Sequence, residues 1–347
     1  MKVRTYFFLL TIIQQSFSLS AQIDLSDDEE KRMLEMGDIP EGWHYKGNMQ
    51  TGLSGSYFSQ WVAGGINSAG LNGLLSFNAN YMRGKNHWEN NLTTGYGIMN
   101  QGFTTRDSWI KSDDRIEITS KYGRPLGKKG FMAALLNFNS QYSKGFENSS
   151  NGRPDRSKVI SNFLAPARVL IALGYDSKPF EGVSLFLSPA TYRGIIVNDP
   201  FLAAQGAYGV TAGKIEYSTN SDGAIIATIT TPGQKIRQEA GAYFRIQVNR
   251  KIKDKITLQL KSELFSNYME KPQNIDIAAD LNLQWQLTKF MSFNMGFSWL
   301  YDDNTTVTKI KSTEETINGE TITVSSTYAS KGLQTRVISS IGLAYQF

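Results

Sequence analysis

The sequence lacks cysteine entirely and contains only nine prolines and two histidines in 347 residues. Without cysteine, disulfide bonds cannot stabilise the chain. Scarce proline is typical of long paired strands, because proline cannot donate a hydrogen bond to a strand ladder. After the first 21 residues, no segment has about 18 consecutive apolar residues, the length that a membrane-spanning helix needs. These absences exclude a disulfide framework and a transmembrane helix.

The first 21 residues are predicted to be a signal peptide. Lys2 and Arg4 form a charged start, residues 6–13 are an apolar run too short to span a bilayer, and small residues lead up to Ala21. The alternatives are a short membrane anchor or a buried first strand. We expect cleavage after Ala21, so that residues 22–347 form an exported mature protein.

Residues 22–45 differ from the rest of the chain and are predicted to be an acidic periplasmic extension. Four consecutive acidic residues at 27–30 precede Lys31 and Arg32. Such a run is typical of a solvated tail, with a plug or a docking segment as the alternative. The net charge of the whole chain is only +5. This balance and the predicted export indicate no nucleic-acid partner.

From residue 46 onward the apolar pattern has a period of two. In residues 291–299, Met, Phe and Trp at odd positions alternate with Ser, Asn and Gly at even positions. Residues 244–249, 256–264 and 275–285 alternate in the same way, which predicts strands with one apolar face. These strands are about 11 to 15 residues long, whereas strands of soluble proteins have about 5 or 6. Strands that cross a membrane at a tilt need about 9 to 11 residues.

Short and long connections alternate along the chain. Twelve strands are predicted, near residues 47–58, 71–84, 87–100, 109–123, 129–144, 165–178, 182–196, 236–250, 255–268, 274–287, 290–302 and 333–347. Short periplasmic turns that alternate with long extracellular loops are typical of an outer-membrane antiparallel β-barrel. The prediction is therefore an all-β transmembrane barrel over residues 46–347, with both termini in the periplasm. Fourteen strands are the alternative, if residues 207–217 and 224–231 also cross the membrane.

The last predicted strand places Val337, Ile341, Leu343, Tyr345 and Phe347 on one face. In a barrel this strand pairs with the first one, so that no open edge remains. An alternating strand that ends in Tyr345 and Phe347 is similar to the signal that the outer-membrane barrel assembly machinery recognises. The predicted partners are this machinery and the lipids of the outer membrane, and the oligomeric state is left open.

Several blocks in a fixed order resemble a known family. They are residues 61–67 (WVAGGIN), 96–97, 111–114 (KSDD), 120–123 (SKYG), 161–166 (SNFLAP), 187–189, 206–209 (GAYG) and 264–268 (LFSNY). Together they look like a family of outer-membrane barrels of the Bacteroidota that is catalogued only as a domain of unknown function. The resemblance runs from about residue 43 to residue 347. It implies fold and location, and it implies no activity.

Charged residues at alternating strand positions are predicted to line the lumen, because Arg or Lys facing lipid at mid-membrane costs about 2 to 4 kcal/mol. The candidates are Lys111, Asp113, Arg115, Glu117, Lys121, Arg245, Lys261, Glu263, Asp276 and Asp280. Both signs occur in rough balance. The pattern favours cross-strand ion pairs that fill a narrow barrel, and the alternative is a lining that selects polar solutes.

Trp61, Gly64 and Gly65 fall in the first long loop and are predicted to fold onto the barrel mouth or into the lumen. Glycine permits positive φ and close backbone approach. No helix follows these glycines, so they are not predicted to bind phosphate. No zinc, haem or nucleotide pattern is present, and no metal or cofactor is predicted.

Catalysis is not predicted. An outer-membrane lipase or protease needs a histidine near the outer rim, whereas His44 and His87 both map to the periplasmic end. The function hypothesis is an outer-membrane barrel that is either a narrow gated passage for small polar solutes or a structural or interaction component. The alternative is an outer-membrane hydrolase.

Overall fold

The computed structural model describes residues 41–56, 68–101, 109–127, 130–148, 154–219, 221, 225–288, 290–303, 306–317 and 320–346. The predicted signal peptide and most of the acidic extension lie outside these residues. Among the described residues, no helix is long and apolar enough to cross a membrane.

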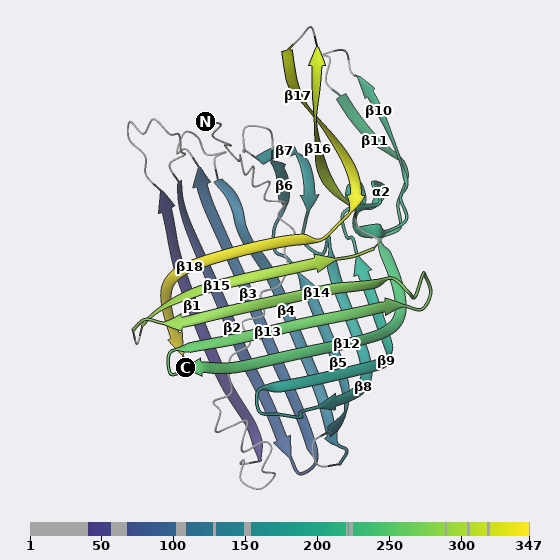
Figure 1. The fold of residues 1–347 in the computed structure, drawn as a ribbon. Helices are drawn as coiled ribbons and strands as arrows, with labels where there is room; N and C mark the ends of the chain where they lie inside the picture. Colours follow the sequence, from purple (N-terminus) through teal and green to yellow (C-terminus); the bar gives the residue numbers. More distant parts are fainter. Residues whose placement is uncertain are drawn as a thin grey trace.

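Twelve antiparallel strands form a closed barrel (Figure 1). In chain order they are β1 (Gly42–Ser56), β2 (Ser68–Arg83), β3 (Asn86–Gln101), β4 (Trp109–Pro125), β5 (Gly130–Ser140), β8 (Ala167–Ser177), β9 (Val183–Ile196), β12 (Ile236–Lys253), β13 (Ile256–Asn267), β14 (Ile275–Gln286), β15 (Met291–Tyr301) and β18 (Gln334–Gln346). Each strand pairs with its neighbours along the chain, and β18 closes the ring against β1. The predicted all-β barrel of twelve strands is confirmed.

The long connections carry secondary structure of their own at one end of the barrel. Three separate hairpins are formed by β6 (Gly145–Asn148) with β7 (Pro154–Ser161), β10 (Lys214–Thr219) with β11 (Ile225–Thr231), and β16 (Thr306–Ile317) with β17 (Glu320–Lys331). The β10–β11 hairpin forms its own two-stranded sheet, so the fourteen-strand alternative is wrong. Its strands have six and seven residues, fewer than the roughly 9 to 11 that cross a bilayer.

The first strand begins earlier than predicted. Gly42 already pairs with Met82, and Trp43 pairs with Tyr81. The predicted barrel boundary at residue 46 is therefore too late by four residues. The acidic run favours a longer tail, but the Trp43 ring packs 5.2 Å from Tyr81 and 5.6 Å from Trp88, measured between ring centroids. These aromatic contacts extend the strand to the short-turn end.

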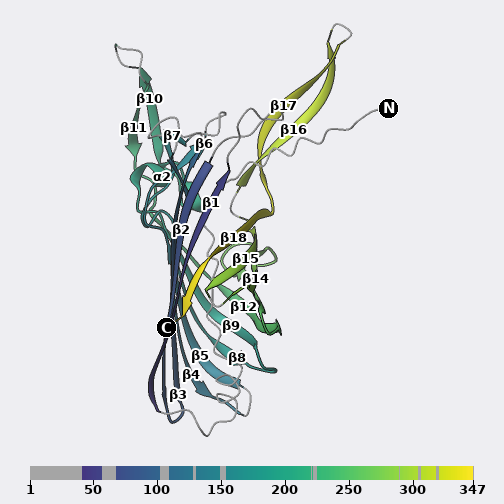
Figure 2. The same ribbon diagram turned by 90° about the vertical axis from the view of Figure 1, so that its left-hand side faces the viewer.

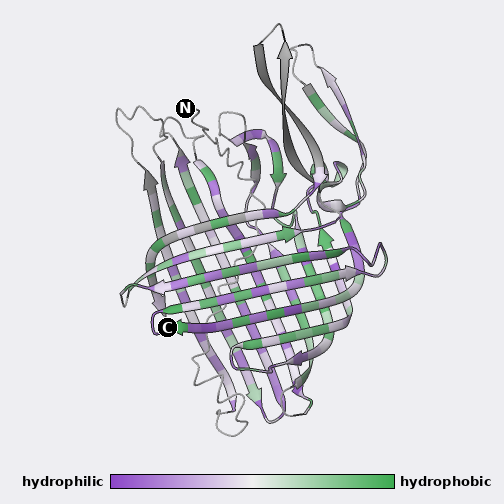
Figure 3. Cartoon of the chain, viewed as in Figure 1, coloured by the Kyte–Doolittle hydropathy of each residue, from purple (hydrophilic) through white to green (hydrophobic). Residues whose placement is uncertain are grey.

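The barrel is apolar outside, and its interior holds charged side chains beside one buried apolar cluster that includes Leu135, Phe186, Tyr243 and Phe265. Leu173 and Leu343 are 59% and 60% exposed, whereas Glu117 and Arg245 are only 2% and 4% exposed. Hydrophobic and hydrophilic residues alternate along the barrel strands (Figure 3). This arrangement is the reverse of a soluble protein, in which large apolar side chains are buried and charges face water. The predicted apolar face of β18 is confirmed, since Val337, Ile341, Leu343 and Tyr345 are all exposed.

A small apolar core lies at the long-loop end. It is formed by buried side chains of the two connections that flank β8 and β9, namely Ala165, Val197, Leu202, Ala203 and Val210. The helix α2 (Pro200–Ala204) and the 3₁₀ turn η2 (Ala207–Gly209) belong to it. We call residues 197–213 together with β7 the loop platform. Because its interior excludes water, the platform is a folded unit and not an open loop.

Candidate functional site: a lumen crossed by ion pairs

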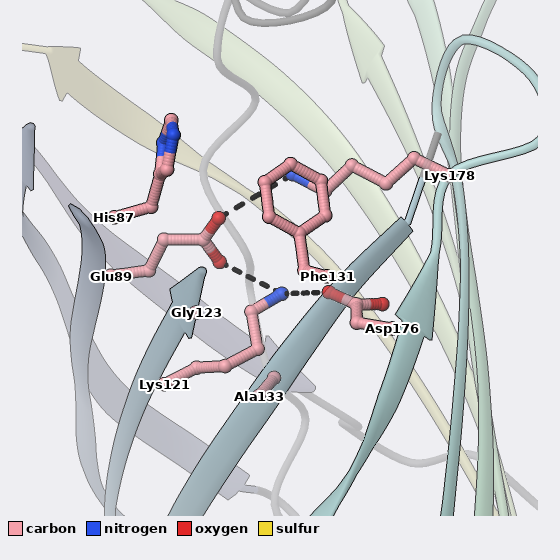
Figure 4. Close-up of a pocket in the computed structure, with 8 residues that line it drawn as sticks. All are labelled: His87, Glu89, Lys121, Gly123, Phe131, Ala133, Asp176 and Lys178. Atoms are coloured by element: carbon pink, nitrogen blue, oxygen red, sulfur yellow. Dashed lines mark hydrogen bonds and ion pairs between the residues drawn. The ribbon is translucent and has the colours of Figure 1, made fainter. Parts of the chain in front are cut away.

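The lumen holds charged side chains at three levels. At the short-turn end, Lys121 on β4 contacts Glu89 on β3 at 2.9 Å and Asp176 on β8 at 2.8 Å. Lys178, just after β8, reaches Glu89 at 3.4 Å. Figure 4 shows these four side chains converging as one chain of ion pairs. They line a cavity of about 20 Å³, which is room for about one water molecule.

The middle level spans the barrel. Lys261 on β13 lies 3.3 Å from Glu117 on β4 and 3.4 Å from Glu263. By the shorter way round, four strands separate β13 from β4. The Lys261–Glu117 contact can therefore form only across the interior. Arg245 lies within electrostatic range of Glu117 and Glu263, so both signs of charge meet at this level.

The loop-end level joins β9, β12 and β14. Arg193 on β9 pairs with Glu239 on β12 and lies 2.5 Å from Asp276 on β14. Arg237 pairs with the same Glu239 carboxylate. The Arg193 guanidinium also stacks 3.9 Å from the ring centroid of Phe265. Because two arginines share the buried Glu239 carboxylate, this level is a network and not a set of isolated pairs.

Most of the predicted lining residues take part in these contacts. Arg115 lies 3.6 Å from Asp113 on the same strand. Asp280 is directly opposite Lys261 in the β13–β14 register, and Glu263 is directly opposite Arg245 in the β12–β13 register. Ion pairs therefore join some of these residues along one strand and others across the interior.

Lys111 is the exception among the predicted lining residues. The register of β3 and β4 shifts so that Gly97 is opposite Asp113 while Ile98 is opposite Lys111. A bulge of this kind reverses the alternation of faces, so the prediction that Lys111 shares a face with Asp113 is wrong. Its Nζ instead donates to Asp114 Oδ2 at 2.8 Å and to the Ser143 carbonyl oxygen at 2.9 Å. Lys111 therefore anchors the connection after β5.

The sequence interpretation missed half of the network. Its unpredicted members are Glu89, Asp176, Lys178, Arg193, Arg237 and Glu239. Alternation within β3, β8 and β9 was the available signal, because each strand has a charge at an inward position. Two other candidates cannot be placed: the mouth residues Trp61, Gly64 and Gly65, and the terminal Phe347, lie outside the described residues. Tyr345 is exposed on the outer face of β18.

The loop platform is tied to the barrel by polar contacts. Asp199 caps α2 by accepting from the backbone N–H groups of Phe201 and Leu202, and it accepts from Asn162 at 3.0 Å. Partial burial opposes ionisation of Asp199, but these three donors outweigh it and hold the pKa of the carboxyl below its ordinary value. Burial raises the pKa of Tyr208 to about 12, and its hydroxyl donates to the Ile160 carbonyl at 2.6 Å.

The two histidines lie close to the short-turn end. His44 on β1 is opposite Asn80, and His87 on β3 is opposite Met82. Asn80 and Met82 both belong to β2. The Nε2 atom of His87 has no hydrogen-bond partner among the described residues, so no described serine is linked to it through this atom. Within the described part of the chain, no cluster of three His, Cys, Asp or Glu residues is arranged to hold a metal ion.

Several solved structures of β-barrels match this chain, with low sequence identity and low TM-scores. The NanC porin has 11% identity and a TM-score of 0.33, covering 86% of this chain and 98% of its own. An outer membrane channel from Pseudomonas putida F1 has 10% identity and a TM-score of 0.36, covering 89% and 97%. The translocator domain of the autotransporter NalP from Neisseria meningitidis has 9% identity and a TM-score of 0.35, covering 92% and 95%.

One family model matches part of the chain. No curated protein matches the chain. The model of a family described as "Protein of unknown function (DUF3078)" matches residues 53–146. The resemblance to a family catalogued only as a domain of unknown function is confirmed over this part of the chain, from late β1 to β6.

Proposed function

We propose that this chain is an integral outer-membrane barrel whose lumen is held shut by ion pairs. In this proposal it acts as a structural or interaction component of the membrane and not as an open pore or a hydrolase. The inverted distribution of side chains supports membrane insertion, since lipid-facing strands need an apolar outer surface and a closed ladder without free edges. The lipids of the outer membrane are the partners that this surface fits.

The proposed orientation follows from the two ends of the barrel. All three hairpins and the loop platform are at one end, and the connections at the other end are two to five residues long. Short turns belong to the periplasmic side of such barrels and long loops to the outside. Both ends of the barrel domain, at β1 and β18, would then be periplasmic, where the assembly machinery acts.

The observation that carries the closed lumen is the Lys261–Glu117 contact. It bridges opposite walls at 3.3 Å, and Asn137 donates to the same Glu117 carboxylate oxygen at 3.2 Å. Beside this contact, the buried side chains of Leu135, Phe186 and Phe265 occupy the interior as well. The ion pairs above and below it narrow the same path again.

A gated passage for small polar solutes is the second candidate. The barrier includes ion pairs beside the buried apolar cluster, and exposed ion pairs are weakened by salt. The paired charges would also line the passage once they separated, and charged rings of this kind set selectivity in channels.

Two measurements test the proposal. Heat-dependent migration on a gel and extraction only with detergent are expected for the membrane barrel, and free solubility in water would contradict it. In planar bilayers the wild-type protein should show no stepwise conductance at low voltage. The double variant Lys261→Ala/Glu117→Ala should conduct, and Lys251→Ala/Lys253→Ala at the short-turn end of β12 is the control. Stepwise openings of the wild type would favour the gated passage.

A further inference from the structure

Two exposed arginines lie level with each other at the short-turn end of the barrel. Arg83 ends β2 and is directly opposite Asn86 on β3. The last pair of the β3–β4 ladder at this end is His87↔Gly123, so Arg124 lies one residue further, level with Asn86. Figures 1 and 2 show β2, β3 and β4 side by side, with these ends away from the three hairpins. The backbones of the two arginines are therefore about 10 Å apart, which is twice the spacing of neighbouring strands.

The next row of the same face is aromatic. Tyr81 is opposite Trp88, and Trp88 is opposite Tyr122. Each of these residues is two positions from the arginine row, so the two rows share a face and are about 7 Å apart along the strands. Trp88 and Tyr122 are each 41% exposed, which places both rows on the outside of the barrel. Aromatic rings of membrane barrels lie at the level of the lipid headgroups. The arginine row then lies just beyond the apolar zone.

Hydrogen bonds hold the aromatic row in place. Trp88 Nε1 donates to Ser120 Oγ at 2.8 Å, and the Tyr122 hydroxyl donates to Asn86 Oδ1 at 2.6 Å. Further from the turns, Leu92 is opposite Ile118, which is 41% exposed. Toward the turns the outer face of β3 and β4 therefore changes from apolar, through polar and aromatic, to basic. Acyl chain, interface and phosphate follow in this order within one lipid leaflet.

The charge of the arginine row is not balanced by the described residues. Within the described part of the chain, neither Arg83 nor Arg124 forms an ion pair. Glu41 precedes the Gly42↔Met82 pair, and its Oε1 atom accepts from the Gly84 backbone N–H at 3.0 Å. Lys85 is exposed in the turn between β2 and β3. An anion at this row thus meets two guanidinium groups and one ammonium group against one carboxylate.

The lysines of the inner face at this end are engaged, in contrast. Lys121 and Lys178 both contact Glu89, and Lys121 also contacts Asp176. Their charge is neutralised inside the barrel, so the excess of positive charge lies on the outer face. Because that face continues into the apolar surface of Ile118, an anion bound there with an apolar tail would satisfy both parts of it.

We infer that Arg83 and Arg124 bind the phosphate of an anionic phospholipid, in the leaflet that the proposed orientation makes periplasmic. A guanidinium group is planar and offers paired N–H donors that match phosphate oxygens. Two arginines on either side of one strand contact the same phosphate, and the acyl chains lie on the apolar surface beyond Trp88. A zwitterionic lipid carries its own cation beside the phosphate, so the site prefers a head with net negative charge. The inference names the lipid class that this barrel retains, and it rests on the membrane insertion proposed above.

Native mass spectrometry of the detergent-solubilised barrel tests this site, with phosphatidylglycerol as the probe and phosphatidylcholine as the comparison lipid. The wild type should retain one phosphatidylglycerol molecule more tightly than phosphatidylcholine. Arg83→Gln/Arg124→Gln should weaken phosphatidylglycerol binding about thirtyfold, and each single variant about fivefold, which are the effects of two and of one basic residue at a membrane surface.

Lys251→Gln/Lys253→Gln is the matched control, because it removes the same charge from the same end of the barrel. It should bind phosphatidylglycerol like the wild type. Equal loss of binding in the two double variants, or equal retention of both lipids by the wild type, would overturn the site. Displacement of phosphatidylglycerol by inorganic phosphate at equal concentration would overturn a lipid as the occupant.

Heat-dependent migration of every variant is recorded in parallel. A folded wild-type barrel without a preference between the two lipids contradicts this site alone. A wild type that is freely soluble without detergent contradicts the membrane insertion itself, so the two failures are distinguished.

Discussion

Lys261 and Glu117 are 144 positions apart in the sequence, yet Lys261 Nζ lies 3.3 Å from Glu117 Oε1 across the lumen. Both side chains are almost fully buried. Lys261→Met should therefore leave a buried carboxylate without its cation, at a cost of about 3 to 5 kcal/mol. The double variant Lys261→Met/Glu117→Gln should be less destabilised than the sum of the single variants. Urea unfolding from vesicles gives this coupling energy, and strict additivity would show that the pair contributes nothing.

The outward orientation of the apolar face is tested by one residue type at two places. Leu173 lies in the middle of β8 and is exposed, so Leu173→Arg should destabilise the inserted barrel by about 2 to 4 kcal/mol. Leu126→Arg changes an equally apolar, exposed residue in the short turn after β4 and should have little effect. Unfolding measurements that give the same small change for both variants would argue that Leu173 faces water.

Gly342 is predicted to be intolerant of a side chain. A Cβ there would lie 2.3 Å from the Thr51 carbonyl oxygen, whereas nothing lies within 4 Å of a Cβ built at Gly73 on β2, the strand on the other side of β1. Gly342→Ala should lower the temperature at which the folded band disappears from a gel, because β1 and β18 must move apart to make room for the methyl group. Gly73→Ala is the matched control and should migrate like the wild type. Identical behaviour of the two variants would contradict the close approach.

The loop platform should lose stability in acid. The pKa of Asp199 is depressed in the folded chain, so its stabilising contribution is present above the ordinary value near pH 4 and is lost as the pH falls through the depressed value. Asp199→Asn keeps a capping oxygen and should flatten this dependence, while Asp199→Ala should cost about 0.5 to 2 kcal/mol at neutral pH. Methyl NMR signals of the buried Ala203 and Ala204 report on the platform. A wild-type platform that is unchanged well below pH 4 would contradict the role of the carboxylate.

Tyr208 titrates in the opposite direction. Its pKa is raised to about 12, so the neutral phenol stabilises the platform below pH 10, and that stability is lost as the pH rises toward 12. An ultraviolet titration should show a phenol that ionises at about pH 12. Tyr208→Phe should remove the late-ionising group and cost about 0.5 to 1.5 kcal/mol through loss of the hydrogen bond to Ile160. If Tyr208→Phe instead removed a phenol that ionises near pH 10, the proposed effect of burial on Tyr208 would be disproved.

Particular errors show where sequence reasoning stopped. The start of β1 was placed too late because the acidic run before it obscured the pairing of Trp43 with Tyr81. Lys111 was placed on the wrong face because one bulge between Gly97 and Ile98 reverses the alternation, and nothing in the residues themselves marks it. Arg193 was missed because its partners, Glu239 and Asp276, lie on other strands.

The sequence by itself determined the twelve strands, their order and their two faces, because alternation along a strand depends only on neighbouring residues. The tertiary structure alone decided which charges meet, that β1 and β18 pair at only five positions, and that two connections share an apolar core. These features depend on how far each strand is staggered as the sheet closes. In the closed sheet β4 comes to lie across from β13, and β1 and β18 keep five pairs. No local pattern in any of these strands encodes how far it is staggered against its neighbours.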